Sequence, residues 1–215
     1  MNARTVRLAT ECLSLYLVAP LATTALLNAG VLQNRDMPLA FFVLFLIALA
    51  LLARTPGFRW RALRPRSPLP DWKLLALYIL ISLPSLYLLT IWLIPGGLFG
   101  FPRHSPDLWM RVMLLYPLLS VLPQSIIYRA LFFARYGPLF PSPVVAVLAN
   151  AAAFALAHLF FQNWIAVGLC AVGGVAFGWV HGQRGSYWSA NLLHVISGWT
   201  VFTLGLGRYF YHGAV

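Results

Sequence analysis

The chain has 215 residues, of which 61% are hydrophobic and only 9% are charged. A water-soluble domain usually carries about 25% charged residues, so this composition indicates a protein that folds in lipid. The formal net charge of +11 would by itself fit a nucleic-acid binder. The basic residues, however, lie mostly at the ends of apolar segments and form no separate basic face, so no nucleic-acid partner is expected.

Apolar stretches follow one another along the chain, and a membrane-spanning helix needs about 20 mostly apolar residues. The predicted spans cover residues 8–27, 37–53, 73–94, 105–134, 142–161, 164–180 and 187–206. The first stretch exceeds the usual length of a signal-peptide core and carries Glu11 near its start, so we expect an uncleaved span. The predicted fold class is all-α, a polytopic transmembrane helix bundle of roughly seven spans, in which residues 1–215 form a single integral membrane domain.

Lysine and arginine residues crowd alternate gaps between the predicted spans. Residues 54–71 hold five arginines and four prolines, a composition that cannot be buried in lipid. The positive-inside rule assigns this loop, and the N-terminus with it, to the cytoplasm. Membrane lipid is the first expected partner, and an odd number of spans leaves the C-terminus outside.

Serine-proline pairs mark two predicted helix starts, at Ser105 and Ser142, where serine caps the helix and proline takes its first position. Pro117 and Pro123 lie inside the fourth span. Each is expected to bend that span, because proline removes an internal hydrogen bond.

Ionisable side chains inside a span are costly in lipid, so they point first to a functional site. Three residues qualify, namely Arg129, His158 and His194. Uncharged polar side chains on the same spans are Gln124, Ser125, Asn150, Asn191 and Ser197.

Helical spacing places several of these side chains on shared faces. The recurring sets are Ser125 and Arg129 four apart, Asn150, Phe154, His158 and Gln162 four apart, and Asn191, His194 and Ser197 three apart. Three helices are therefore expected to converge on one polar pocket. A structural interpretation stands beside this one, because Arg129 lies near the end of its span and could snorkel to the headgroups, and either histidine could be a packing residue.

The order of these motifs resembles the CPBP family of intramembrane proteases, which includes the CAAX prenyl proteases and bacteriocin-immunity proteins. That family carries Glu-Glu-x-x-x-Arg, then Phe-x-x-x-His, then His-x-x-x-Asn or Asp on its membrane helices. Here residues 124–129 read Gln-Ser-Ile-Ile-Tyr-Arg, residues 154–158 read Phe-Ala-Leu-Ala-His, and residues 194–198 read His-Val-Ile-Ser-Gly. The resemblance covers residues 110–212, so spans four to seven form the expected protease-like core.

A bacterial subgroup whose first motif reads Pro-Gln-Glu is more similar still. It tends to share Pro123, Gln124, Gly198 and an ending like Gly205–His212. Where that subgroup has its two glutamates, this chain has Ser125 and Leu193. The four acidic residues of the chain are Glu11, Asp36, Asp71 and Asp107, and none is expected in the pocket.

The resemblance implies an endopeptidase of the bacterial inner membrane that hydrolyses peptide bonds of membrane-associated substrates. The family is thought to use a glutamate to activate water, while histidine and its neighbours orient the water or stabilise the oxyanion. The matching catalytic positions here are Gln124, Ser125, Arg129, His158 and His194, and the candidate substrate-binding residues are Phe154, Asn150 and Asn191.

The sequence gives weak support for a metal. Zinc would be the first candidate, with His158 and His194 as its ligands, but catalytic zinc usually takes three protein ligands. Cys12 and Cys170 are the only cysteines and lie in apolar runs, so they predict neither a disulfide nor a cysteine-based zinc site.

Several functions therefore remain open. A neutral histidine could replace the missing carboxylate as general base, which would give an endopeptidase with an altered site. Alternatively, Arg129 and both histidines could hold a membrane-embedded or lipidated peptide on an inactive protease-like scaffold. A transporter or a purely structural bundle would use the same apolar spans. We expect little or no hydrolysis from the chain as written, and a carboxylate at position 125 is expected to point into the pocket beside Arg129.

Overall fold

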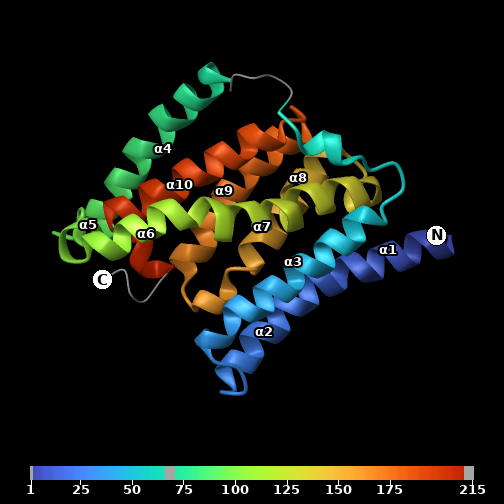
Figure 1. Cartoon of the computed structure of the whole chain (residues 1–215), viewed down its shortest axis with the longest axis horizontal. Coiled ribbons are helices and arrows are strands. Elements are labelled where there is room, and N and C mark those ends of the chain that lie inside the picture. Colours follow the sequence, from blue (N-terminus) through green and yellow to red (C-terminus); the bar gives the residue numbers. More distant parts are fainter. Residues whose placement is uncertain (1, 66–70, 211–215) are drawn as a thin grey trace.

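The computed structural model describes residues 2–65 and 71–210, and these ranges contain only helices and connecting turns (Figure 1). The all-α prediction is confirmed for this part of the chain. Tyr211 and His212, which end the terminal motif, lie outside the described residues.

The first helices are α1 (Ala3–Leu13), η1 (Ser14–Val18), α2 (Ala19–Asn28), α3 (Met37–Ala53) and α4 (Trp72–Leu93). They are followed by α5 (Gly100–His104), α6 (Pro106–Tyr116), η4 (Pro117–Val121), α7 (Leu122–Ser125), η5 (Ile126–Tyr136), α8 (Pro143–Leu156), η7 (Leu159–Phe161), α9 (Trp164–Gly182) and α10 (Tyr187–Leu204). The hairpin of α1, α2 and α3 and the helix α4 lie on opposite sides of the later helices (Figure 1). The hairpin packs on η5, whereas α4 packs on α10.

Among the described residues, six helical stretches are long and apolar enough to cross a membrane. They are Ala3–Asn28, Asn34–Ala53, Trp72–Leu93, Pro106–Leu139, Pro143–Phe161 and Trp164–Gly182. The remaining predicted span is α10, an 18-residue helix that carries buried Asn191 and His194. Because these polar side chains pack against neighbouring helices, α10 can be less apolar than a helix that faces lipid. The chain is thus a polytopic integral membrane protein.

The fourth span is one long rod in which α-helical and π-helical turns alternate. Pro117 opens the π-helical turn η4, and the eleven-residue π-helix η5 begins three residues after Pro123. A π-helix is normally a single turn and is frequent at functional sites. The span continues to Leu139, beyond the predicted end at Ala134. A change in helix type thus lies near each of the two prolines that were expected to bend the span.

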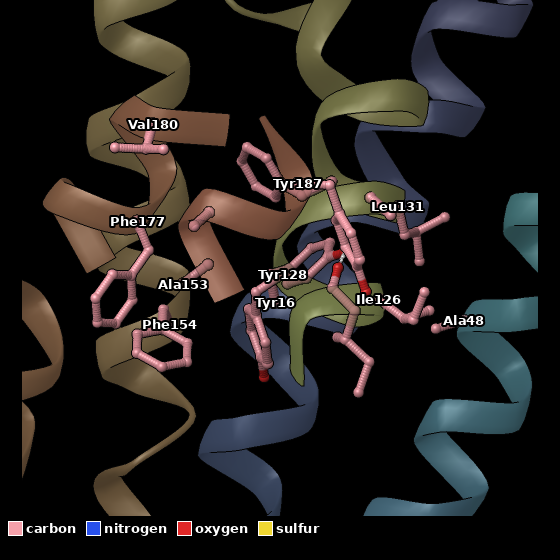
Figure 2. Close-up of a cluster of buried hydrophobic side chains, with 14 of the residues drawn as sticks. Tyr16, Ala48, Ile126, Tyr128, Leu131, Ala153, Phe154, Phe177, Val180 and Tyr187 are labelled. Carbon is pink, nitrogen blue, oxygen red and sulfur yellow. Dashed lines mark hydrogen bonds between the residues drawn. The ribbon is translucent and has the colours of Figure 1, made fainter. Parts of the chain in front are cut away.

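Side chains from two other helices hold the π-helix η5 in place. The Tyr16 hydroxyl of η1 donates a hydrogen bond to the carbonyl of Ile127 over 2.7 Å, and the Asn150 amide of α8 donates to the carbonyl of Tyr128. The Tyr16 ring also meets the Tyr128 ring edge to face, with centroids 5.6 Å apart (Figure 2). Asn150 was predicted to bind substrate, whereas this contact braces the backbone of η5.

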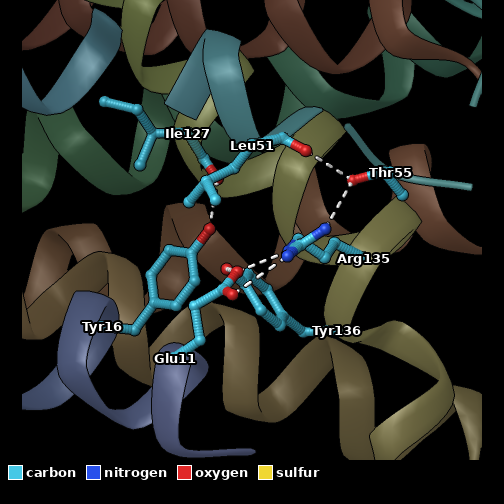
Figure 3. A network of polar contacts seen from close by, with 7 residues as sticks. All are labelled: Glu11, Tyr16, Leu51, Thr55, Ile127, Arg135 and Tyr136. Carbon is cyan, nitrogen blue, oxygen red and sulfur yellow. Dashed lines mark hydrogen bonds and ion pairs between the residues drawn. The ribbon is translucent and has the colours of Figure 1, made fainter. Parts of the chain in front are cut away.

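An ion pair fastens the first helix to the end of η5 (Figure 3). Arg135 donates two hydrogen bonds to the Glu11 carboxylate, over 2.5 and 3.0 Å, and the Tyr136 hydroxyl donates a third over 2.6 Å. Arg135 also donates to the Thr55 hydroxyl over 3.4 Å. Because the Arg135 and Glu11 side chains are only 9% and 23% exposed, water screens this pair incompletely.

We predict that Glu11→Gln lowers the stability of the protein in detergent by about 1–3 kcal/mol, because Arg135 loses a charged, bidentate partner in a partly buried place. Thermal unfolding of the purified protein measures this effect. The matched control is Asp71→Asn, which removes the carboxylate of the exposed Arg184–Asp71 pair. The control should change stability by about 0.5 kcal/mol or less, and equal losses in the two variants would contradict the special role of Glu11.

Candidate functional site

A cavity of about 840 Å³ lies between α4, α6, α9 and α10 and extends to the turn that follows α8. Four of the predicted site residues line it, namely Gln124, Phe154, His158 and His194. The wall is otherwise mainly apolar. The expected convergence of three helices is therefore present in the structure, although it involves fewer of the predicted side chains.

The other predicted site residues do not line the cavity but lie buried behind its wall. They are Ser125, Arg129, Asn150 and Asn191, together with Leu193, each at most 5% exposed. Gln162 lies apart from both groups, because α8 ends at Leu156 and Gln162 adopts a left-handed backbone with φ of 57°. It is exposed and donates to Asn28 over 2.9 Å, so the predicted polar stripe breaks after His158.

Phe154 is the side chain that the ionisable residues share. The guanidinium carbon of Arg129 lies 4.3 Å from the centroid of the Phe154 ring, and the ring centroids of His158 and His194 lie 4.7 and 5.4 Å from it. Phe177 of α9 adds a second aromatic surface, on which the His194 ring stacks at 4.8 Å. Phe154 and Phe177 line the cavity, whereas Arg129 lies behind them. Their ring faces also stabilise the charge of Arg129, because the face of an aromatic ring attracts cations.

Arg129 is only 1% exposed, so the interpretation that it snorkels to the headgroups is wrong. Its guanidinium also lies 5.2 Å from the centroid of the Phe177 ring. Its two terminal nitrogens have no hydrogen-bond partner among the described residues, and no described carboxylate forms an ion pair with it. A buried cation without a counter-ion is costly, and here aromatic ring faces offset only part of that cost.

The position of His158 follows from the end of α8. Phe154 lies in the last turn of that helix, where carbonyl groups lack partners further along the helix. Its carbonyl oxygen is 2.7 Å from Nδ1 of His158. Because a carbonyl can only accept, Nδ1 carries the proton and Nε2 of the neutral ring is left as an acceptor. His158 is thereby oriented to accept a proton or a hydrogen bond in the cavity.

His194 is held by packing more than by hydrogen bonds. Its Nδ1 is buried and has no partner in the described part of the chain.

A hydrogen bond between Tyr78 and Ser197 lies one turn further along α10. Ser197 already donates its proton to the carbonyl of Leu193 over 2.7 Å, so the Tyr78 hydroxyl, 2.6 Å away, is the donor to Ser197. Tyr78 thus links α4 to α10 in the cavity wall, a contact between residues 119 positions apart that no local pattern could predict.

Tyr116 is a further wall residue that the sequence did not indicate. Its ring meets the His194 ring edge to face, with centroids 6.1 Å apart. A methyl group added to Gly198 would lie 2.2 Å from a carbon of the Tyr116 ring, so only glycine allows this close approach. The glycine four residues after His194 was the available signal, and its physical reason is the tyrosine that packs on it.

Both residues at the expected glutamate pair are neutral and buried to different degrees. Gln124 lines the cavity and donates to the Ser120 hydroxyl over 2.7 Å. Ser125 is 1% exposed, and its hydroxyl has no partner among the residues that the structure describes. A carboxylate at position 124 would therefore meet the cavity directly, whereas one at position 125 would lie behind its wall.

The donor set does not fit a catalytic zinc site. The described ranges contain no group of three histidine, cysteine, aspartate or glutamate residues that could hold a metal ion. His158 and His194 supply two nitrogen ligands at most, and catalytic zinc usually takes three protein ligands.

Residues 106–200, from the start of α6 to the middle of α10, match the family model described as type II CAAX prenyl endopeptidase Rce1-like. This part of the chain is similar to the type II CAAX prenyl endopeptidases. The resemblance seen in the motifs is thus confirmed, and the matched segment contains Gln124, Arg129, His158 and His194. Comparisons with curated proteins and with solved structures give no match.

We predict that Arg129 contributes to folding through its volume and not through its charge. Arg129→Ala should lower stability by about 2–4 kcal/mol, because it leaves a void between Phe154 and Phe177. Arg129→Met should stay within about 1 kcal/mol of the parent or exceed it, because an apolar chain of similar length removes an uncompensated buried charge. Thermal unfolding in detergent separates the two variants, and a loss in Arg129→Met as large as that in Arg129→Ala would refute the prediction.

Gly198→Ala should displace Tyr116 from His194 and lower stability by about 1–3 kcal/mol through overpacking. Gly168→Ala on α9 is the matched control, because no atom lies within 4 Å of the added methyl group. The control should be neutral or slightly stabilising, since alanine favours helix over glycine. Unfolding temperatures of the two variants measure the difference. Equal effects would contradict the prediction, because they would show that the Tyr116 ring can move away without loss of stability.

Proposed function

We propose that this chain binds a membrane-embedded or lipid-modified peptide in the cavity and has lost most of the hydrolytic activity of its family. One observation carries the proposal. In the part of the chain that the structure describes, the cavity wall includes Gln124, His158 and His194 but no aspartate or glutamate. Water attacks a peptide bond very slowly unless a base removes its proton, so retained binding with impaired hydrolysis is the function that this wall supports.

The cavity suits an apolar ligand with a polar end. Its volume of about 840 Å³ falls within the usual range of ligand pockets, about 300–1,000 Å³. Apolar side chains of α4, α6 and α9 form most of the wall, and burying a hydrocarbon chain or an apolar peptide segment against them is favourable. The two histidines and Gln124 offer hydrogen bonds to a peptide group in this cavity.

A second candidate function is slow hydrolysis with His158 as the general base. The hydrogen bond from its Nδ1 to the Phe154 carbonyl favours it, because the free Nε2 can accept a proton from water. Stabilisation of the oxyanion is weaker in this site. Arg129 is separated from the cavity by Phe154 and Phe177, so its guanidinium is not available as a direct donor.

We also propose that the protein resides in a bacterial inner membrane with its N-terminus in the cytoplasm. The arginine-rich loop between α3 and α4 supports this orientation through the positive-inside rule. The Glu11–Arg135 pair and the contact of Arg135 with Thr55 are consistent with it, because they bring this loop and the first helix to the same end of the bundle.

Restoring a carboxylate tests the proposal. Gln124→Glu, alone or with Ser125→Glu, should raise cleavage of a membrane peptide by about 10² to 10⁴-fold over the unmodified protein, as expected for a recovered general base. Ser125→Glu, alone or with Leu193→Glu, tests the position indicated by the sequence and should gain less, because neither side chain lines the cavity. Cleavage and binding are measured on purified protein with lipidated and unlipidated peptides.

The matched control is Gln162→Glu, which adds the same charge at an exposed position outside the cavity wall and should leave both readouts unchanged. His158→Ala added to Gln124→Glu should abolish the gain. Failure of the unmodified protein to bind any peptide of the panel would overturn the proposed function. Robust cleavage by the unmodified protein that survives His158→Ala and His194→Ala would overturn it equally.

A further inference from the structure

A second hollow lies at the end of the bundle where the α3–α4 loop meets η5. It has a volume of about 460 Å³ and is lined by Pro56–Arg59, Arg61, Ala62 and Ala134. It shares no residue with the wall of the larger cavity. Any ligand of this hollow is thus separate from the peptide proposed above.

The backbone of the loop gives the hollow a fixed shape. Gly57 has φ of 79°, a conformation that other residues rarely adopt, and the Phe58 amide closes the turn on the carbonyl of Thr55 over 3.1 Å. The Phe58 side chain packs on the hydrophobic core and meets the Trp60 ring edge to face at 5.2 Å. A short 3₁₀ helix, η3 (Trp60–Leu63), then carries Arg61 to the rim.

The hollow carries positive charge without compensation. Arg59 and Arg61 line it, and Arg54 and Arg64 flank it at exposed positions. None of these four arginines forms an ion pair with a carboxylate among the described residues. Glu11, on the first helix, is already bound by Arg135. An anion is the ligand that this charge distribution would attract.

The position of the hollow limits the kind of anion. α3 ends at Ala53 and η5 ends at Tyr136, so the hollow lies where two helices of membrane-spanning length end. Trp60 beside it is 50% exposed, as is common for tryptophan at the level of lipid headgroups. At this depth the abundant anions are the phosphates of acidic lipids.

We propose that the headgroup of an anionic phospholipid binds in this hollow, with its phosphate held by Arg59 and Arg61. Guanidinium groups match phosphate through paired, charge-assisted hydrogen bonds. The two arginines come from one turn, and Ala134 of η5 lines the hollow with a small side chain that leaves room for the headgroup. The α3–α4 loop is thereby a lipid-recognition element of this protein.

Binding of phosphatidylglycerol to the full-length protein in detergent, measured by native mass spectrometry against phosphatidylcholine, tests the proposal. Phosphatidylglycerol should bind more tightly. Arg59→Gln and Arg61→Gln should each weaken its binding about fivefold, the usual contribution of one basic residue near a membrane surface. Ala134→Phe should weaken binding without any change of charge, because the added ring fills the hollow.

The matched control is the double variant Arg54→Gln with Arg64→Gln, which removes the same charge from the same loop but from outside the wall of the hollow. It should lose clearly less affinity than Arg59→Gln with Arg61→Gln. Equal losses in the two double variants would overturn the proposal in favour of diffuse attraction to the loop. Equal binding of the two lipids would overturn it, as would displacement of phosphatidylglycerol by equimolar inorganic phosphate.

Discussion

A positive charge enclosed by aromatic rings is the constraint on which the rest of the structure depends. Arg129 is 1% exposed and has no described carboxylate beside it, so the phenylalanines at 154 and 177 must lie close enough for their ring faces to attract its guanidinium. The same two rings also pack against the His194 ring, and the carbonyl of Phe154 accepts a hydrogen bond from His158. The cation and the two histidines are therefore one packed unit, although only the histidines reach the cavity.

The part of the chain outside the family match stabilises that unit. The matched segment begins at residue 106, yet the π-helix that carries Arg129 is braced by Tyr16 and latched by Glu11. A π-helix longer than a single turn is rare, and these contacts hold this one in place. On the opposite side, Tyr78 of α4 completes the cavity wall through Ser197. The first four helices thus frame the site without supplying its arginine or its histidines.

The sequence predicted the helices well because apolar length and helix caps are local signals. The span at 37–53 coincides with α3, and the serine at 142 caps α8 as expected. The predicted cap at Ser105 is wrong, because α6 begins there without a hydrogen bond to the serine side chain. The motifs also predicted that Gln124, His158 and His194 share one pocket, and all three line the cavity. The sequence could not predict η5, because a four-residue face rule assumes regular α-helix, nor the partners of Glu11 and Tyr78, because those contacts join residues more than 100 positions apart. The polar stripe breaks before Gln162 because α8 ends at Leu156, and the exact last residue of a helix is hard to place from sequence.

The Glu11–Arg135 ion pair between the first helix and η5 also sets an order of events during synthesis. Glu11 and Arg135 are 124 residues apart, and ribosomes add about 5–20 residues per second, so the arginine follows the glutamate by roughly 6–25 seconds. Throughout that interval Glu11 lacks the charge of Arg135, its bidentate partner in the folded protein. Emergence of the fourth span supplies that charge and joins the hairpin to the nascent protease-like half. The contact between the N-terminal helix and η5 can therefore form only after residue 135 has left the ribosome.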